Sequence, residues 1–176
     1  MSVTLVLGGA RSGKSRFAES LSHGKRHYVA TAQAFDDEMR DRIALHQRQR
    51  GDGWLTHEEV FAVSPRLENL NDPANFILVD CLTLWLSNLM LADHDVADAT
   101  MRLLMILQTM KADVVLVSNE VGLGIVPETP LGRAFRDTQG RLNQQVAEVA
   151  DRVVFIVAGL PLMLKGTMPE GPPARA

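Results

Sequence analysis

The residues with the most specific chemistry lie near the start of the chain, where a glycine-rich loop leads into a lysine and a serine. The loop follows directly on an apolar run from Val3 to Leu7. Gly8 and Gly13 let the backbone N–H groups surround a polyphosphate, and a helix that begins after them adds positive potential. A lysine at this spacing neutralises β- and γ-phosphate oxygens, and the next hydroxyl binds Mg²⁺. We therefore predict a loop that binds a nucleoside triphosphate through Gly8, Gly9, Ala10, Arg11, Ser12, Gly13, Lys14 and Ser15.

Such a loop needs a strand before it and a helix after it, and the rest of the chain continues this alternation. Nearly unbroken apolar runs, typical of strands covered on both faces, occur at 27–31, 76–79, 114–117 and 153–157. Helical periodicity occurs at 95–111 and at 131–150, where Leu131, Phe135, Leu142, Val146 and Val149 fall close to one face. The pattern predicts an α/β fold with a mainly parallel central sheet flanked by helices.

The length of 176 residues suits one domain. We expect this domain to span 1–165 and a flexible tail to span 166–176, which lacks periodicity and apolar content. A net charge of −3 and 5% aromatic residues disfavour a nucleic-acid partner. No apolar segment reaches the length of a membrane span or of a signal-peptide core. The single cysteine, Cys81, excludes an internal disulfide, so we expect a reduced, cytoplasmic protein.

One predicted strand, 76–79, ends in a carboxylate, Asp80. In a P-loop fold, an acid at the carboxyl end of a strand lies beside the phosphate loop and holds Mg²⁺ directly or through water. Aspartate also caps helices, and a helical run follows Cys81, so a helix cap is the alternative interpretation. We favour the metal role, which makes Ser15 and Asp80 the predicted metal ligands.

A histidine lies at the seam between an apolar and a basic stripe of a predicted helix over 36–50. His46 is four residues from Arg42 and from Arg50, and it adjoins the apolar stripe that contains Ile43. One interpretation is a ring that packs at the boundary of the core. In the other interpretation, a neutral imidazole, with a usual pKa of about 6.5, attacks phosphorus while the guanidinium groups stabilise the bound phosphate.

Together these motifs resemble the family of adenosylcobinamide kinase / adenosylcobinamide-phosphate guanylyltransferase, the bifunctional enzyme of cobalamin nucleotide-loop assembly. The resemblance spans nearly the whole chain. Its motifs are residues 7–16 with 18–19, 28–31, 36–39 with 42–43 and 46, 80–83, 117–127, 135–137 and 140–144, together with Trp54 and Glu58. It implies a single-domain P-loop NTPase of the RecA-like type. Asp137 and Asn143 belong to the resemblance without an assigned role.

The resemblance implies two reactions. The terminal phosphoryl group of ATP or GTP first moves to the aminopropanol hydroxyl of adenosylcobinamide. A histidine then attacks the α-phosphorus of GTP, pyrophosphate leaves, and adenosylcobinamide phosphate takes GMP from the histidine to give adenosylcobinamide-GDP. By its position in the pattern, His46 is the guanylylated residue, and Leu45 stands where some members have a second histidine. The implied partners are adenosylcobinamide and its phosphate, and the implied assembly is a homo-oligomer, the family's form being a ring-like trimer.

The predicted catalytic residues are His46, Lys14, Asp80 and Glu120. Lys14 serves both steps because it absorbs charge on the departing phosphates. Glu120 orients Mg²⁺ or accepts the hydroxyl proton, or else it only shapes the glycine turn that follows it. The guanine and ribose contacts implied by the resemblance are Thr31, Ala32, Gln33, Arg48, Arg50, Gly51, Gly53 and Glu58.

Two alternatives stay open at this point. One is a P-loop small-molecule kinase that performs no nucleotidyl transfer, with His46 as a residue at the edge of the core. The other is a nucleotide-dependent binding module or switch without a small substrate. GTP, ATP and Mg²⁺ are the expected cofactors of the bifunctional enzyme.

Overall fold

The structure is a computed structural model that describes residues 1–33 and 52–168. Its strands are β1 (Val3–Gly8), β2 (Lys25–Ala30), β3 (Trp54–Glu58), β4 (Asn75–Asp80), β5 (Asp113–Asn119), β6 (Arg152–Val157) and β7 (Leu160–Lys165). Its helices are α1 (Lys14–Ser20), α3 (Val63–Asn69), α4 (Leu82–Leu91), α5 (Val96–Leu107) and α6 (Pro130–Val149). The predicted helix over 36–50 lies outside the described residues.

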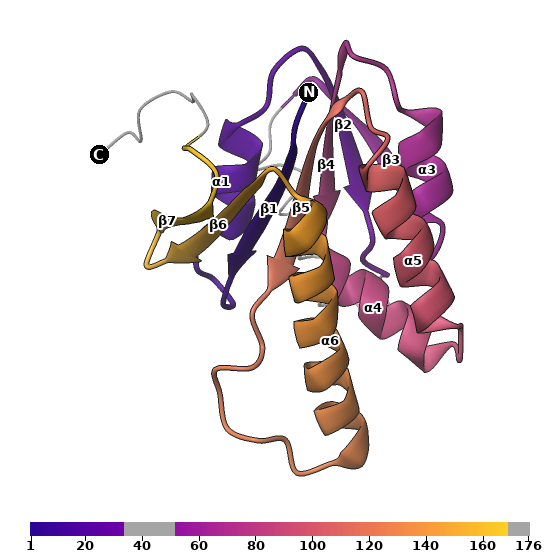
Figure 1. Ribbon diagram of the computed structural model, residues 1–176, viewed down its shortest axis with the longest axis vertical. Coiled ribbons are helices and arrows are strands. Elements are labelled where there is room, and N and C mark those ends of the chain that lie inside the picture. The colour runs from indigo at the N-terminus through magenta and orange to yellow at the C-terminus, as the bar shows by residue number, and fades with distance from the viewer. Residues whose placement is uncertain (34–51, 169–176) are drawn as a thin grey trace.

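All the described strands join one sheet in the order β3-β2-β4-β5-β1-β6-β7 (Figure 1). Strands β1 to β6 pair in parallel, and β7 pairs antiparallel with β6. This order confirms the predicted α/β fold with a mainly parallel sheet. The five apolar runs form β1, β2, β4, β5 and β6, which are the interior strands. Sequence patterns missed the two edge strands, because β3 is largely exposed and β7 alternates between exposed and half-buried residues.

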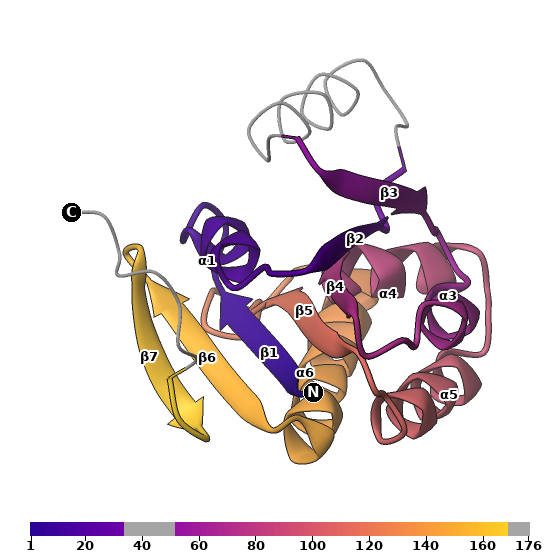
Figure 2. The same ribbon diagram turned by 90° about the horizontal axis from the view of Figure 1, so that it is seen from above.

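Helices cover both faces of the sheet, with α1 on one face and α3, α4, α5 and α6 on the other (Figure 2). Successive strand residues point to opposite faces, so each interior strand contributes to both layers of the core. In β1, for example, Leu5 packs with the layer under α3–α6 and Val6 with the layer under α1. Both side chains are fully buried, which explains why these strands read as unbroken apolar runs.

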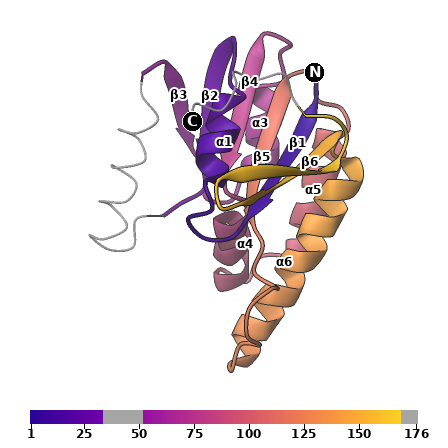
Figure 3. The same ribbon diagram turned by 90° about the vertical axis from the view of Figure 1, so that its left-hand side faces the viewer.

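Helix α6 extends past the sheet at its N-terminal end (Figure 3). Leu142 and Val146 are buried as the periodicity predicts, but Leu131 is 57% exposed. The expected apolar face therefore fails in the first turn, where the helix has no strand beneath it. Gln139 takes a fully buried position instead.

The last described strand, β7, ends at Lys165, where the predicted domain ends. The division between a domain and a tail stays a prediction, because residues 169–176 lie outside the described part of the chain. Among the described helices, none combines the length and the apolar character that crossing a membrane requires.

Two histidines connect the edge strand β3 to β2. The Nδ1 atom of His27 lies 3.0 Å from Nε2 of His57, and the two rings stack. Burial is the main cause that lowers the pKa of both imidazoles below 6.5. The positive charge of Arg66 adds to the lowering at His57, while the Asn75 side chain acts in the opposite direction at His27. A proton on this pair therefore favours the unfolded chain.

We predict that the protein loses stability as the pH falls from about 7.5 to about 5.5, because the unfolded chain then binds more protons at these histidines than the folded one. Urea unfolding at several pH values measures this dependence. His57→Gln should reduce it, whereas His94→Gln, at an exposed histidine in the loop between α4 and α5, should leave it unchanged. An equal pH dependence in wild type and in His57→Gln would contradict the assignment.

Candidate nucleotide site

The glycine-rich loop connects β1 to α1 at the carboxyl edge of the sheet. Arg11 has a φ of 55°, and Gly13, the residue before α1, has a φ of 95°. These left-handed conformations turn the chain so that Lys14 becomes the first residue of the helix. The Nζ atom of Lys14 donates a hydrogen bond of 3.2 Å to the carbonyl of Gly9. The ammonium group thus lies over its own loop, where a polyphosphate would be neutralised.

Gly8 is the tightest point of this loop. A Cβ atom at Gly8 would lie 2.5 Å from Oγ of Ser12 and 2.8 Å from the carbonyl oxygen of Ile156. A Cβ atom at Gly9 would meet nothing within 4 Å. The loop is also joined to the β6–β7 turn, because the N–H of Gly159 donates to the carbonyl of Ser12 at 2.9 Å. The phosphate loop therefore sits on a fixed support at its first glycine.

The end of β5 is attached directly to the loop. In the register of β1 and β5, Gly8 faces Asn119, and the N–H of Glu120 donates to the Gly8 carbonyl at 3.1 Å. The Glu120 carboxylate accepts a 2.6 Å hydrogen bond from the N–H of Gly122. The glycine-turn contact of Glu120 is thus present in the structure. Its metal or proton-accepting role stays a prediction.

Asp80 lies at the same edge, with β5 between its strand and β1. This confirms that Asp80 and Glu120 share one edge of the sheet. The residue at the N-cap of α4 is Cys81 and not Asp80, so the alternative of Asp80 as a helix cap is wrong. The Asp80 carboxylate instead accepts a 3.0 Å hydrogen bond from the Tyr28 hydroxyl.

The electrostatics at Cys81 place Asp80 and Lys14 in one neighbourhood. Burial, followed by the negative charge of Asp80, raises the pKa of the Cys81 thiol to about 11, and the positive charge of Lys14 opposes this increase. Both charges therefore act on the same buried sulfur atom. A thiol with this pKa stays protonated near neutral pH.

Thr31 is fully buried and ties the end of β2 to the chain after β4. Its hydroxyl donates to the carbonyl of Cys81 at 2.7 Å and accepts from the Cys81 N–H at 2.8 Å. Ala32 and Gln33 follow as half-buried residues at the same edge. Nucleotide contacts by these three residues stay predictions, and for Thr31 the structure shows a hydroxyl engaged with the backbone.

The structure does not bring Gly53 and Glu58 to the same place. Glu58 is exposed at the carboxyl end of β3, opposite Ala30 of β2 and on the edge that carries the loop. Gly53 precedes the amino end of β3 and thus lies at the opposite edge, where a Cβ atom would clash with the guanidinium of Arg26. A φ of 89°, which residues with a side chain rarely adopt, accounts for a glycine at 53 without a nucleotide. His46, Arg48, Arg50 and Gly51 lie outside the described residues.

A buried polar cluster supports the end of β5, and sequence patterns gave it no role. The Oδ1 atom of Asn143 accepts hydrogen bonds from Oγ of Ser118 at 2.7 Å and from Nε2 of Gln139 at 3.0 Å. The Asn143 amide donates to the carbonyl of Asn119 at 3.1 Å. The N–H of Asn119 donates in turn to the Thr83 hydroxyl at 2.8 Å. The signal for this cluster in the sequence was a pair of polar residues, Gln139 and Asn143, four apart on an apolar face of the helix.

The donor set at this edge fits a magnesium ion. Within residues 1–33 and 52–168 no three His, Cys, Asp or Glu side chains cluster to form a metal site. Mg²⁺ with a nucleotide needs no such cluster, because it binds through one or two protein oxygens, the phosphates and water. The Ser15 hydroxyl and the Asp80 carboxylate are oxygen donors of this kind.

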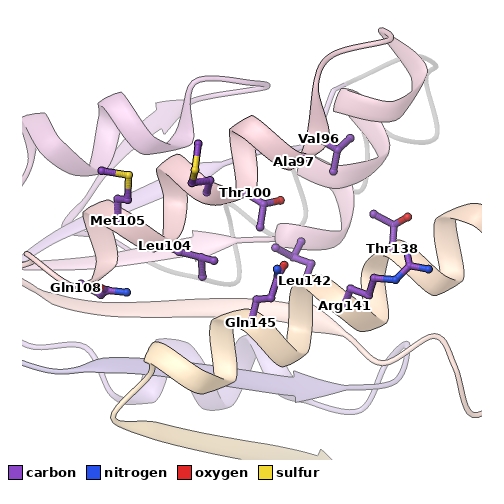
Figure 4. Close-up of a pocket in the computed structure, with 11 residues that line it drawn as sticks. Val96, Ala97, Thr100, Leu104, Met105, Gln108, Thr138, Arg141, Leu142 and Gln145 are labelled. Carbon is purple, nitrogen blue, oxygen red and sulfur yellow. The ribbon is translucent and has the colours of Figure 1, made fainter.

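A cavity of about 520 Å³ lies elsewhere, between α5 and α6 (Figure 4). It contains none of the predicted site residues, and its lining is mostly apolar, with Met105, Leu104 and Leu142 beside Arg141 and Gln145. The cavity lies in the helical layer, whereas the residues predicted to bind phosphate and metal lie at the carboxyl edge of the sheet.

Comparison with known proteins agrees with the resemblance seen in the sequence. A model of the family described as cobinamide kinase / cobinamide phosphate guanyltransferase matches residues 4–164. The bifunctional adenosylcobalamin biosynthesis protein CobP of Pseudomonas aeruginosa is 47% identical over 92% of this chain and 96% of its own length. The protein CobU of Escherichia coli is 38% identical over 92% of this chain and 98% of its own length.

Solved structures show the fold without close sequence similarity. An ATPase from the type III secretion system of pathogenic bacteria superposes with a TM-score of 0.54 at 11% identity, over 92% of this chain and 56% of that one. A protein from Pyrococcus horikoshii superposes with a TM-score of 0.53 at 10% identity, over 96% of this chain and 88% of its own.

The contrast between the first two loop glycines gives a matched test. We predict that Gly8→Ala lowers the free energy of unfolding by about 1–3 kcal/mol, because the new methyl group overlaps fixed backbone and side-chain atoms. Gly9→Ala should change it by less than about 0.5 kcal/mol, as for a surface substitution. Denaturant unfolding without nucleotide measures both values. Equal losses in the two variants would show that the loop is not fixed at Gly8.

Proposed function

Because the chain belongs to the cobinamide kinase / cobinamide phosphate guanyltransferase family, we propose that it phosphorylates adenosylcobinamide with ATP or GTP and then converts the phosphate to adenosylcobinamide-GDP with GTP. Both reactions act on a nucleoside triphosphate, in cobalamin nucleotide-loop assembly. The observation that carries the proposal is the attachment of the phosphate loop to the end of β5 through the Glu120 N–H and the Gly8 carbonyl. This hydrogen bond supports the proposal because it holds the phosphate loop beside Glu120, at the edge where phosphate, metal and acceptor would meet.

In the first reaction, the loop N–H groups and Lys14 bind the triphosphate, and Lys14 exchanges its contact with the Gly9 carbonyl for phosphate oxygens. Ser15 and Asp80 would hold Mg²⁺, which withdraws charge from the phosphate oxygens when it is bound. Glu120 would accept the proton of the aminopropanol hydroxyl, after releasing the Gly122 N–H. The hydroxyl oxygen then forms a bond to the γ-phosphorus as the bond to the departing diphosphate breaks.

In the second reaction, the neutral imidazole of His46 forms a bond to the α-phosphorus of GTP while pyrophosphate leaves. Lys14 again stabilises the charge that develops on the leaving group. A phosphate oxygen of adenosylcobinamide phosphate then attacks the same phosphorus, and the N–P bond breaks to regenerate His46. Arg42 and Arg50 favour the neutral imidazole, because two nearby positive charges disfavour a third.

The remaining expectations belong to the same proposal. Thr31, Ala32, Gln33 and Glu58 contact the guanine or ribose from the carboxyl ends of β2 and β3, and Arg48, Arg50 and Gly51 complete this set. The enzyme works in the cytoplasm as a homo-oligomer of the family's trimeric type. Adenosylcobinamide and its phosphate are the acceptors.

A kinase without nucleotidyl transfer is the alternative. It would need only groups that lie in the described part of the chain, namely Lys14, Ser15, Asp80 and Glu120. Only His46 separates the two proposals, so a test of that residue decides between them.

We predict that GTP labelled at the α-phosphate transfers label to the wild-type protein, and that the bond is labile in acid, as a phosphorus–nitrogen bond is. His46→Ala should take up no label, while His94→Ala, at an exposed surface histidine, should be labelled like wild type. Phosphorylation of adenosylcobinamide by ATP should persist in His46→Ala. A wild-type protein that phosphorylates adenosylcobinamide but takes up no label would favour the kinase alternative.

Substitution of the loop lysine tests whether one phosphate site serves both reactions. We predict that Lys14→Gln slows phosphorylation and guanylylation by at least about 100-fold each, because both lose the same cation. Lys111→Gln, at an exposed lysine, is the control and should leave both rates unchanged. Loss of only one activity in Lys14→Gln would mean that the two reactions use different phosphate sites. Rates with separated substrates provide the measurement.

A further inference from the structure

We propose that Tyr28 is a positioning residue that holds the Asp80 carboxylate in the orientation in which it binds the metal ion. The inference rests on the proposed function, because it takes Asp80 as a ligand of Mg²⁺. Tyr28 belongs to β2, the strand next to β4, and its hydroxyl donates a 3.0 Å hydrogen bond to Oδ2 of Asp80. This leaves the other carboxylate oxygen, Oδ1, as the proposed ligand of the metal ion.

The register of the two strands allows this contact to be direct. Tyr28 pairs with Leu78 and Ala30 pairs with Asp80, so Tyr28 and Asp80 are diagonal neighbours on the same face of the sheet. Diagonal neighbours lie roughly 7–8 Å apart at the backbone, a span that a tyrosine ring bridges and a shorter side chain does not. A phenol is therefore the side chain that reaches the carboxylate from this position.

Packing fixes the Tyr28 ring. Tyr28 is only 7% exposed, and its ring meets Trp54 edge to face at a centroid distance of 6.0 Å. Trp54 in turn meets Phe76 edge to face at 6.1 Å. The three rings come from β2, β3 and β4, so strands of the sheet position the Tyr28 ring.

Other residues hold the backbone of Asp80, so Tyr28 acts on its side chain alone. The N–H of Thr31 donates to the Asp80 carbonyl at 3.2 Å, and the Thr31 hydroxyl bonds both backbone groups of Cys81. Asn88 donates to the Thr31 carbonyl at 2.8 Å and so secures the clamp from α4. With the main chain fixed, rotation of the carboxylate is the remaining freedom, and the phenol bond removes it.

Removal of the hydroxyl should weaken metal binding without disturbing the packing. Hydrogen bonds to a metal-binding carboxylate are typically worth about 10–100-fold in metal affinity. We predict that Tyr28→Phe raises the Kd for Mn²⁺, measured by electron paramagnetic resonance in the presence of a non-hydrolysable GTP analogue, by about 10-fold. Lys111→Gln, at an exposed lysine beside the amino end of β5, keeps the hydroxyl and its packing and should leave this Kd within about twofold, which is below the range expected for a lost ligand contact.

A double-substitution cycle shows whether Tyr28 acts through Asp80. Asp80→Asn should weaken Mn²⁺ binding on its own, and Tyr28→Phe should add little in the Asp80→Asn background, since the two side chains form one unit. Equal effects of Tyr28→Phe in both backgrounds would overturn the proposal. A Kd for Mn²⁺ that is unchanged in Tyr28→Phe while Asp80→Asn weakens binding would also overturn it.

The chain has a single tyrosine, which gives a second measurement that does not depend on a Tyr28 variant. Protein labelled with ¹³C at the tyrosine ring carbon that bears the hydroxyl has one such resonance. It should shift in Asp80→Asn, because a neutral amide accepts the phenol proton less strongly than a carboxylate. An unchanged resonance would overturn the proposal, whereas failure of the labelling assay with GTP would concern the guanylyl transfer alone.

Discussion

The parallel pairing of β1, β5 and β4 is the constraint on which the site depends. It brings three carboxyl ends to one edge and places a different group at each: the phosphate loop after β1, Glu120 after β5 and Asp80 at the end of β4. The backbone bond from the Glu120 N–H to the Gly8 carbonyl locks the loop to its neighbour. No loop rearrangement is needed to bring these elements together.

Buried contacts hold each of the three ends. The loop is packed so closely at Gly8 that a methyl group would overlap Ser12 and Ile156. Asn143 of α6 binds the carbonyl of Asn119 from within the core, and Tyr28 binds the Asp80 carboxylate from the adjacent strand. Preorganisation of this kind matters because catalytic groups stabilise a transition state best when they need not reorganise during the reaction.

Much of this arrangement could be predicted from the sequence, for physical reasons that are specific to each element. The apolar runs identified the interior strands because strands covered on both faces exclude polar residues, and the glycine spacing located the turn between β1 and α1. The sequence patterns did not predict the edge strands β3 and β7, because at least half of the residues in each strand are exposed. The contacts of Tyr28 with Asp80 and of Asn143 with Asn119 could not be predicted, because each joins residues that are distant in the chain. Gly53 lies at the edge opposite the loop, where its φ of 89° explains the glycine.

A crystal structure with Mg²⁺ and a non-hydrolysable GTP analogue tests the central claim most directly. The account predicts that the β- and γ-phosphates lie within residues 8–15 and that Nζ of Lys14 has left the Gly9 carbonyl for a phosphate oxygen. It also predicts that a ring nitrogen of His46 lies about 3–3.5 Å from the α-phosphorus, in line with the departing oxygen. Phosphates bound away from this loop, or an α-phosphorus that His46 cannot approach, would contradict it.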